Sequence, residues 1–398
     1  MKINLKENNY WRPSPFMYDI SMFILVNKEI LKKKVKVENL EKIPEKAPLL
    51  VVGNHTNYID PAYLAYVFHN HAKKSIHLNF MMLDDLLGKD SWKSKIINKL
   101  ANIFNGYPVD RDRITRAQHN FFRNILMDDY LAIFFGGRRS RDGTFNYMYK
   151  KDRSAEGIVH LVEVAQKEIN LKKEENKTLV NILPFAMTYD IFGDVTITFD
   201  NYLTFNPKEL NGVELKKERK KFVEDIINNN VGYNVKVNLD ALFADYLVRY
   251  ANQYDDEKSA KLVLNQEKFR KDLYSMVNIL NKNSRINLDV DLLNKPYFSD
   301  MFNRVFEYFD AKQGVIEKIN REDYILYKKW IIREPCMGEQ KTKEEQEKMG
   351  KKELKEYKRQ IRKIDKNTIY HRNKIIHLEE VSEAYEKVNE QNKRLTPA

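Results

Sequence analysis

The sequence has 398 residues, a formal net charge of +12 at pH 7 and a single cysteine. This length favours two or three domains and permits a sizeable core. Because Cys336 is the single cysteine, an internal disulfide and a multi-cysteine metal site are excluded, which fits a reducing compartment. The positive charge favours an anionic partner, and nucleic acid, phospholipid head groups, a phosphorylated substrate and an acidic carrier protein all satisfy it.

The first twelve residues are polar and lack an apolar core followed by small residues, so no signal peptide is predicted. No apolar stretch approaches the roughly 20 residues that a helix needs to cross a bilayer. We therefore expect any contact with a membrane to be peripheral.

Residues 1–46 are predicted to form an amphipathic helix and a linker. Apolar side chains recur at helical spacing and lysines cluster at the far end of the same segment: Phe16, Met17, Ile20, Phe23, Ile24 and Leu31, then Lys28, Lys32, Lys33 and Lys34. Two interpretations remain open, a helix that docks on the core and a helix that lies on an anionic membrane.

Residues 48–52 form a short apolar run bounded by proline and glycine, which predicts a buried strand. Asp60 followed by Pro61 is typical of a helix N-cap with proline in the first turn, and residues 62–69 continue as a helix. His55 is therefore predicted to lie in a strand-to-helix turn together with Asp60.

The turn permits a pairing that a helix would prevent, since five helical steps of about 100° would place the two side chains roughly 140° apart. The carboxylate of Asp60 could accept the Nδ1 proton of His55, which leaves Nε2 to take a proton from a substrate hydroxyl. This is the base and orienting acid of a hydrolase triad without its nucleophile. Alternatively, Asp60 only caps the helix and His55 is an ordinary turn residue.

Further along the chain, residues 76–82 are predicted to form a strand and residues 84–104 a helix. Residues 106–113 then form a strand end that leads into alternating aspartate and arginine. Arg111 is a candidate for binding an anion, because a guanidinium group suits phosphate. The alternative is a set of surface ion pairs.

Residues 130–135 predict another buried strand, which leads into a glycine- and arginine-rich segment. Glycines at a strand end let the backbone approach a ligand closely, and three arginines in four positions concentrate positive charge. Residues 136–143 are thus predicted to cradle a phosphate, and a nucleic-acid contact and a solvated basic hairpin remain as alternatives.

Strands alternate with helices up to about residue 250, which predicts an α/β domain with a mainly parallel sheet over residues 47–253. It includes a helix over residues 154–168, a strand over 179–189 interrupted by Pro184, a strand over 195–199, and helices over 215–228 and 239–253. Residues 254–398 predict a helical, Lys/Glu-rich domain, with an aromatic cluster assigned to its core and a solvated helix at 341–366. The cluster consists of Tyr297, Phe298, Phe302, Phe306 and Phe309.

Four of these segments, taken in order, resemble the glycerophospholipid acyltransferase superfamily, which includes glycerol-3-phosphate and 1-acylglycerol-3-phosphate acyltransferases. The segments are Asn54-His55 with Asp60 (an HX4D motif), residues 106–113, residues 134–143, and residues 182–184 followed by Tyr189. Their order and spacing agree over about residues 35–250.

The resemblance implies a function and a set of site residues. The fold would be that of a glycerolipid acyltransferase, and the enzyme would move a fatty acyl group from acyl-CoA or acyl-carrier protein to a phosphorylated glycerol acceptor in phospholipid biosynthesis. His55 and Asp60 would be catalytic. The residues implied to bind substrate are Arg111, Gly137, Arg138, Arg139, Ser140, Arg141 and Pro184. The implied location is cytoplasmic and peripheral on the inner face of a membrane, with no nucleic-acid partner.

One departure from the family pattern concerns Gly136, which stands where the third motif normally carries a glutamate that helps to seat the glycerol backbone. A different orientation of the acceptor, a related acceptor or slow turnover would each account for it. Gly136 also supports the competing hypothesis, a non-catalytic basic protein with an acyltransferase-like fold that binds a membrane surface or nucleic acid.

Residues 370–377 resemble a motif found downstream of the acyltransferase domain in glycerol-3-phosphate acyltransferases, which favours glycerol 3-phosphate as the acceptor. No serine-centred nucleophile elbow and no cysteine lie near the motifs, so direct transfer without an acyl-enzyme, a metal or a cofactor is expected. Backbone N–H groups in the turn before Pro61 are candidates for stabilising the oxyanion.

Overall fold

The protein is described from a computed structural model. The structure describes residues 15–28, 33–57, 59–73, 75–83, 105–109, 114–135, 143–144, 156–172, 179–206, 212–253, 261–312, 315–320, 322–333, 349–350, 353 and 366–395. The chain divides into two compact units. The first comprises Met1–Arg139, Tyr147–Tyr189 and Gly193–Asn234, and the second comprises Ser140–Asn146, Asp190–Phe192 and Val235–Ala398.

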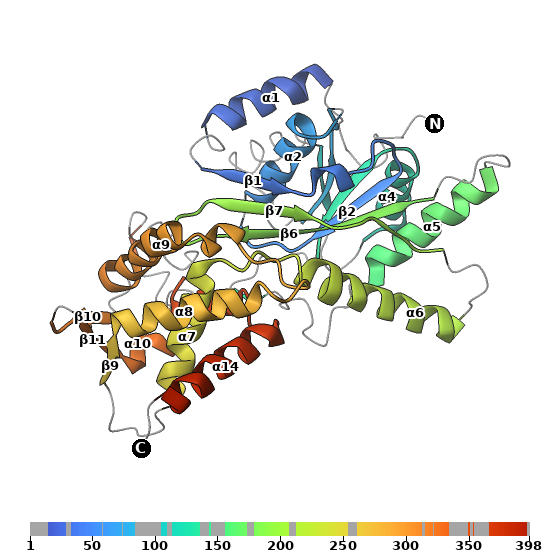
Figure 1. The fold of residues 1–398 in the computed structure, drawn as a ribbon. Coiled ribbons are helices and arrows are strands. Elements are labelled where there is room, and N and C mark those ends of the chain that lie inside the picture. Colours follow the sequence, from blue (N-terminus) through green and yellow to red (C-terminus); the bar gives the residue numbers. More distant parts are fainter. Residues whose placement is uncertain are drawn as a thin grey trace. The chain divides into compact units, whose positions relative to one another are not determined.

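The first unit contains a mainly parallel sheet flanked by helices, as the sequence predicted (Figure 1). Its strands lie in the order β1-β7-β6-β2-β5-β3-β4, and β8 pairs with β6. Among the strands that the structure describes in this unit, the pairs β6–β7 and β6–β8 alone are antiparallel. The strands are β1 (Val35–Glu38), β2 (Leu49–Gly53), β3 (Asn79–Leu83), β4 (Gly106–Val109), β5 (Tyr130–Phe134), β6 (Asn181–Tyr189), β7 (Val195–Phe199) and β8 (Leu203–Thr204).

Four helices of the first unit fall within a few residues of their predicted positions, namely α1 (Pro15–Lys28), α2 (Asp60–Asn70), α5 (Glu156–Lys172) and α6 (Gly212–Asp225). The helix α4 (Arg116–Asp128), the short 3-10 turn η3 (Leu40–Lys42) and the π-helical segment η7 (Ile226–Gly232) were not predicted. The helix predicted over residues 84–104 lies outside the described residues.

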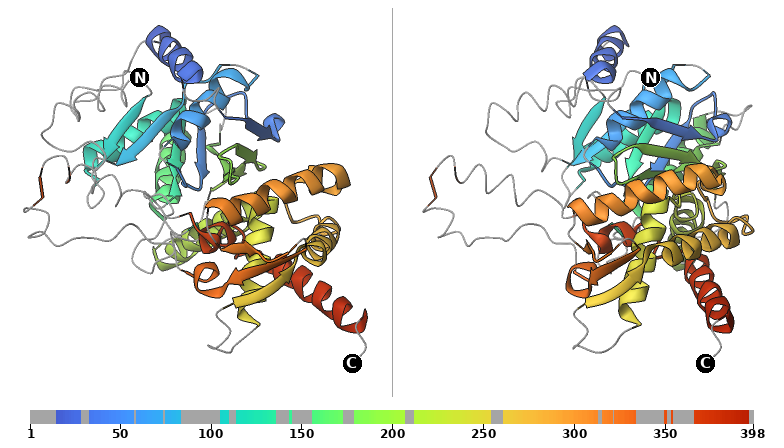
Figure 2. Two further views of the ribbon diagram at one scale, coloured as in Figure 1. Left: turned by 90° about the vertical axis from the view of Figure 1, so that its left-hand side faces the viewer. Right: turned by 60° about the vertical axis from the view of Figure 1, so that its left-hand side comes forward.

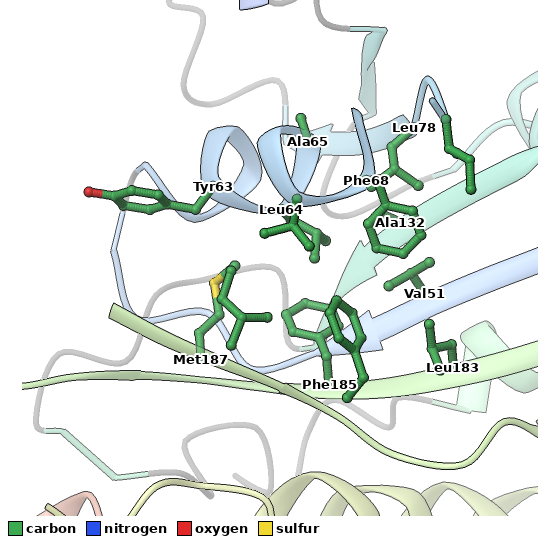
Figure 3. Close-up of a cluster of buried hydrophobic side chains, with 14 of the residues drawn as sticks. Val51, Tyr63, Leu64, Ala65, Phe68, Leu78, Ala132, Leu183, Phe185 and Met187 are labelled. Atoms are coloured by element: carbon green, nitrogen blue, oxygen red, sulfur yellow. The ribbon is translucent and has the colours of Figure 1, made fainter. Parts of the chain in front are cut away.

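The core between α2 and the sheet is formed by alternate residues of the central strands, because successive side chains of a strand point to opposite faces. Figure 3 shows Leu64 and Phe68 of α2 directed towards Val51 of β2 and Phe185 of β6. All four side chains are buried. The branched residues of β2 thus fix α2 against the sheet, and with it the turn that joins these two elements.

Strand β6 is continuous through Pro184, which corrects the prediction of an interrupted strand. Pro184 stands opposite Val52 in the parallel pairing with β2, and its carbonyl oxygen accepts a hydrogen bond from the backbone N–H of Asp200 at 3.0 Å. A proline removes one donor from the sheet but keeps its acceptor, so neighbouring strands can hold it in place.

The second unit combines helices with a small sheet that the sequence did not predict (Figure 2). Its helices are α7 (Leu239–Asn252), α8 (Gln266–Leu280), α9 (Lys295–Glu307), α10 (Lys328–Ile331), α13 (Thr368–Asn373) and α14 (Glu379–Leu395), with a 3-10 turn η8 (Val290–Leu293) and a π-helical segment η9 (Tyr308–Lys312). The antiparallel strands β9 (Lys261–Asn265), β10 (Ile316–Lys318) and β11 (Asp323–Tyr327) pair in the order β10-β11-β9.

The aromatic cluster forms part of the core of the second unit, as predicted, with one exception. Phe298, Phe302, Phe306 and Phe309 are buried, whereas Tyr297 is 37% exposed. Tyr297 lies in the first turn of α9 and therefore projects at the end of the helix, where the core does not cover it.

A buried polar group joins α7 to α13 within the second unit. One carboxylate oxygen of Asp240 lies 3.1 Å from Nδ1 of His371 and 2.9 Å from Nζ of Lys374. Burial and the nearby Lys374 charge lower the pKa of His371 to about 4, although Asp240 opposes that shift. Burial acts to raise the pKa of Asp240, but Lys374 and His371 outweigh it and lower the pKa. At neutral pH the pair is therefore an ionised carboxylate beside a neutral imidazole.

Two members of this group, His371 and Lys374, lie within the segment whose sequence resembled a downstream acyltransferase motif. His371 is 1% exposed, and its ring packs against Tyr308 and Phe309. The motif therefore supplies a buried connection inside the second unit.

No helix in the described ranges combines the length with the apolar character that crossing a bilayer requires.

The domain limits at residues 46 and 253 remain predictions about the acyltransferase domain. The two compact units divide the chain at other points, and α7 belongs to the second unit.

Candidate active site

The carboxyl ends of several parallel strands of the first unit meet at one edge of its sheet. Gly53 at the end of β2 pairs with Phe134 at the end of β5 and with Phe185 of β6. Val109 at the end of β4 pairs with Leu83 at the end of β3. Ligand sites of open α/β sheets lie at this edge, outside the carboxyl ends of the strands.

His55 and Asp60 lie in the turn that leaves β2 at this edge. Nδ1 of His55 is 2.8 Å from Oδ2 of Asp60. The Asp60 side chain is fully buried and that of His55 is 15% exposed. The structure therefore brings together the two residues that the sequence predicted to pair, and it leaves part of the imidazole open to solvent.

The carboxylate of Asp60 is surrounded by hydrogen-bond donors. Oδ2 also accepts from the backbone N–H groups of Thr56 at 2.7 Å and Asn57 at 2.8 Å, and Oδ1 accepts from the hydroxyl of Tyr189 at 2.5 Å. Because Oδ2 accepts hydrogen bonds from two backbone N–H groups, it carries no proton itself. The hydrogen between Asp60 and His55 is therefore on Nδ1 of His55. Nε2 then carries the free lone pair, which is the state of a general base.

Tyr189 is a part of this site that the sequence did not assign. It ends β6 and reaches Asp60 across 129 positions of sequence. Its place in the fourth motif was a signal for it, but no spacing rule relates a tyrosine at the end of one strand to a carboxylate that follows another.

Asn54 is a second supporting residue, and it continues the pairing of β2 with β6 beyond the end of β2. Its side-chain amide donates to the carbonyl oxygen of Met187 at 2.9 Å, and its side-chain oxygen accepts from the backbone N–H of Met187 at 2.7 Å. These two bonds anchor the residue immediately before His55 to a strand in the middle of the sheet.

Aromatic packing holds the imidazole from the side of the sheet. The rings of His55 and Phe134 lie 4.7 Å apart between centroids, and Phe134 in turn meets Phe185 edge-on at 5.8 Å. Gly53 is required here, because a Cβ atom at this position would come within 2.6 Å of the Phe185 ring. The glycine that precedes the turn thus allows a bulky residue of β6 to support it.

Two details of the turn differ from the prediction. Asp60 is the first residue of α2 and not its N-cap, which is Ile59, and the Asp60 carboxylate binds N–H groups that precede the helix. Because Thr56 and Asn57 donate their backbone N–H groups to Asp60, these groups are not free to stabilise an oxyanion. The carboxylate needs both donors to compensate for its burial, and it takes them from the turn.

Most of the predicted substrate-binding residues lie outside the described residues, namely Arg111, Gly137, Arg138, Arg139, Ser140 and Arg141, and so does Gly136. Pro184 lies within β6, one residue before Phe185. Of the glycine- and arginine-rich segment at residues 136–143, the structure describes the last residue, Gly143. Gly143 has a positive φ of 81° and packs directly on the backbone of Tyr370 within the second unit, where a side chain would not fit.

Comparison with known proteins agrees with the motifs. Residues 34–187 match the protein-family model described as Acyltransferase. Among solved structures, the chain is similar to the crystal structure of the 1-acyl-sn-glycerophosphate (LPA) acyltransferase, PlsC, from Thermotoga maritima, with a TM-score of 0.34 and 17% sequence identity over 53% of this chain and 77% of that one. This weak likeness carries no information about the substrate. No curated protein matches the chain.

The family match covers β2, the His55–Asp60 turn, β5 and most of β6, which are the elements that form the site. Residues 34–187 of this chain are therefore an acyltransferase domain, the family that the four motifs predicted.

Proposed function

We propose that the protein transfers a fatty acyl group from an acyl thioester, acyl-CoA or acyl-carrier protein, to a hydroxyl group of glycerol 3-phosphate or lysophosphatidic acid. The observation that carries this proposal is the buried Asp60 carboxylate, which holds His55 through Nδ1 at the carboxyl edge of the sheet and leaves Nε2 without a hydrogen-bond partner among the described residues. The acyltransferase family of residues 34–187 supplies the reaction class.

In the proposed reaction, Nε2 of His55 removes the proton of the acceptor hydroxyl while its oxygen attacks the thioester carbonyl. The buried negative charge of Asp60 stabilises the imidazolium that forms. When the tetrahedral intermediate collapses, the C–S bond breaks. The thiolate leaves readily because a thiol has a pKa of about 8.5, and it takes the proton from the His55 imidazolium, which restores the base. The thioester is already activated, so this proposal includes neither a metal nor a cofactor.

The phosphate of the acceptor is assigned to the arginines that follow β4 and β5. Val109 is the last residue of β4, and Phe135 directly follows the end of β5. Because β4 and β5 belong to the same run of parallel strands as β2, the carboxyl ends of β4 and β5 lie at the edge that carries His55. Arg111, Arg138, Arg139 and Arg141 follow within a few residues, and guanidinium groups bind phosphate in a bidentate manner.

The protein is proposed to work as a peripheral protein on the inner, cytoplasmic face of a membrane, where its lipid substrates and products reside. Within α1, Tyr18 and Met22 are buried, whereas Phe16, Met17 and Ile20 are 69%, 39% and 39% exposed. The helix therefore presents apolar side chains outward on a chain with a net charge of +12, a combination that suits an anionic lipid surface.

The first prediction concerns the base. His55→Ala is expected to lower kcat by about 100- to 10,000-fold, because it removes the group that accepts the hydroxyl proton. The assay supplies the purified protein with acyl-CoA or acyl-carrier thioester and glycerol 3-phosphate or lysophosphatidic acid, and it measures free thiol and lipid product. His71→Ala, at an exposed histidine of the same unit, is the matched control and should keep its activity. A His55→Ala enzyme that retains most activity would overturn the assignment.

The second prediction concerns Tyr189 as a positioning residue. Tyr189→Phe keeps the ring but leaves one oxygen of the buried carboxylate without its donor, which costs about 1–3 kcal/mol in the free energy of unfolding. With less of its charge compensated, Asp60 should stabilise the imidazolium more strongly. The acid limb of the pH–rate profile is then expected to move to higher pH. A variant that loses stability but keeps the wild-type pH profile would show that the tyrosine only supports the fold.

The third prediction concerns the arginines. Arg111→Ala and Arg139→Ala are expected to raise the KM for the phosphorylated acceptor with little effect on the KM for the acyl donor, because they remove phosphate contacts. Arg116→Ala, at an exposed arginine at the start of α4, provides the control. If only the KM for the donor changes, both arginines belong to the donor site.

The fourth prediction concerns the membrane. Phe16→Asp and Ile20→Asp change exposed residues of α1 and leave its buried Tyr18 and Met22 in place. Each is expected to weaken co-sedimentation with vesicles that contain phosphatidylglycerol by at least about tenfold, since an apolar side chain is no longer buried in lipid. Val213→Asp, at an equally apolar and 85% exposed position of α6, is the control. Binding that is equal in all three variants and the wild type would exclude this role for α1.

A further inference from the structure

Three side chains of types that bind metals converge beside α1 and α2 in the first unit. Asp19 lies on α1, His69 lies in the last turn of α2, and His77 lies two residues before β3. Oδ1 of Asp19 is 2.9 Å from Nε2 of His69 and 3.0 Å from Nε2 of His77, and the three donor atoms lie within 4.8 Å of one another. None of these residues belongs to the proposed catalytic set.

The donor set and its spacing suit zinc. Two imidazole nitrogens and a carboxylate oxygen are common zinc ligands, with bonds of about 2.0–2.2 Å. In a tetrahedral site such bonds place neighbouring donors about 3.3 Å apart. The two distances to Asp19, 2.9 and 3.0 Å, therefore need to open by only a few tenths of an ångström, and the two Nε2 atoms, which lie within 4.8 Å of each other, need to reach the same spacing.

Neighbouring rings hold the two imidazoles in a common orientation. The rings of His69 and His77 are nearly parallel, at 9° between planes and 5.8 Å between centroids. The buried ring of Tyr18 stacks on His77 at 4.4 Å. Little rotamer freedom is then lost when a metal binds, which is how a site gains affinity through preorganisation.

The site is open on one side. The Asp19 side chain is 48% exposed, whereas those of His69 and His77 are 19% and 24% exposed. An ion can enter from this side, and a water molecule can complete a four-coordinate shell there.

Hydrogen bonds alone would also account for the contacts, since one carboxylate oxygen can accept from both Nε2–H groups. In that case both imidazoles carry their proton on Nε2, whereas a metal at Nε2 moves the proton to Nδ1. Nδ1 of His69 is buried and has no hydrogen-bond partner among the described residues. This atom is unsatisfied in either tautomer, so it favours neither arrangement.

We propose that Asp19, His69 and His77 bind a zinc-class divalent ion that fastens α1 to α2. Among the α1 side chains that the structure describes, Tyr18 and Met22 are the buried ones. An ion that joins three segments of the chain adds a connection that these two apolar contacts do not provide. Its role is structural, because it holds the helix with the exposed apolar face against the domain that carries His55.

The test is a calorimetric titration of the full chain with Zn²⁺ after removal of bound metal with a chelator. The wild type is expected to bind one ion at this site. Asp19→Asn, His69→Gln and His77→Gln should each weaken that event at least about tenfold, since each removes a ligand. His71→Gln, at an exposed histidine directly after α2, should bind as the wild type does. Equal binding in all variants, or no binding by the wild type, would overturn the proposal.

Hydrogen exchange provides a second measurement that does not depend on enzymatic activity. Zn²⁺ is expected to slow amide exchange in α1 of the wild type and of His71→Gln, but not of Asp19→Asn. The largely exposed Asp19 contributes little to packing, so this variant keeps the fold in which the comparison is made. Equal slowing of α1 exchange in Asp19→Asn would contradict the site.

Discussion

The active-site region depends on one buried carboxylate. Asp60 would be costly to bury as an ion without partners, and its partners are the imidazole of His55, two backbone N–H groups of the same turn and the hydroxyl of Tyr189. These contacts fix the path of the chain between β2 and α2, and they also set the tautomer of His55. In the proposed mechanism stability and reactivity have the same origin, since the group that orders the turn also prepares the imidazole to accept a proton.

The sheet provides the frame for this carboxylate. The parallel pairing of β2 with β5 and β6 aligns Gly53, Phe134 and Phe185, so that the turn starts from three strands held in register. Asn54 extends this alignment by one further residue through Met187. Because parallel strands place their carboxyl ends at one edge, segments distant in sequence can serve a single substrate.

Local patterns in the sequence predicted much of this fold. The branched run of β2, the alternation in β7 and the apolar spacing of α5 each determine an element through residues that are near one another in the chain. Predictions failed where a distant partner decides the structure. Pro184 stays within β6 because β2 and Asp200 hold it. The small sheet of the second unit depends on pairing between β9 and β11, which are separated in the chain by α8, α9 and β10.

Short motifs that lie close to the strands that carry them were enough to predict the acyltransferase family and the mainly parallel sheet. They also suggested the pairing of His55 with Asp60, but left open that Asp60 only caps the helix, and the structure decided for the pairing. Only the tertiary structure assigned Tyr189 to the carboxylate and showed that the N–H groups of Thr56 and Asn57 are already used. It alone placed Asp19, His69 and His77 together. These contacts join residues from different elements, and their distances follow from how helices pack on a sheet, which no local pattern specifies.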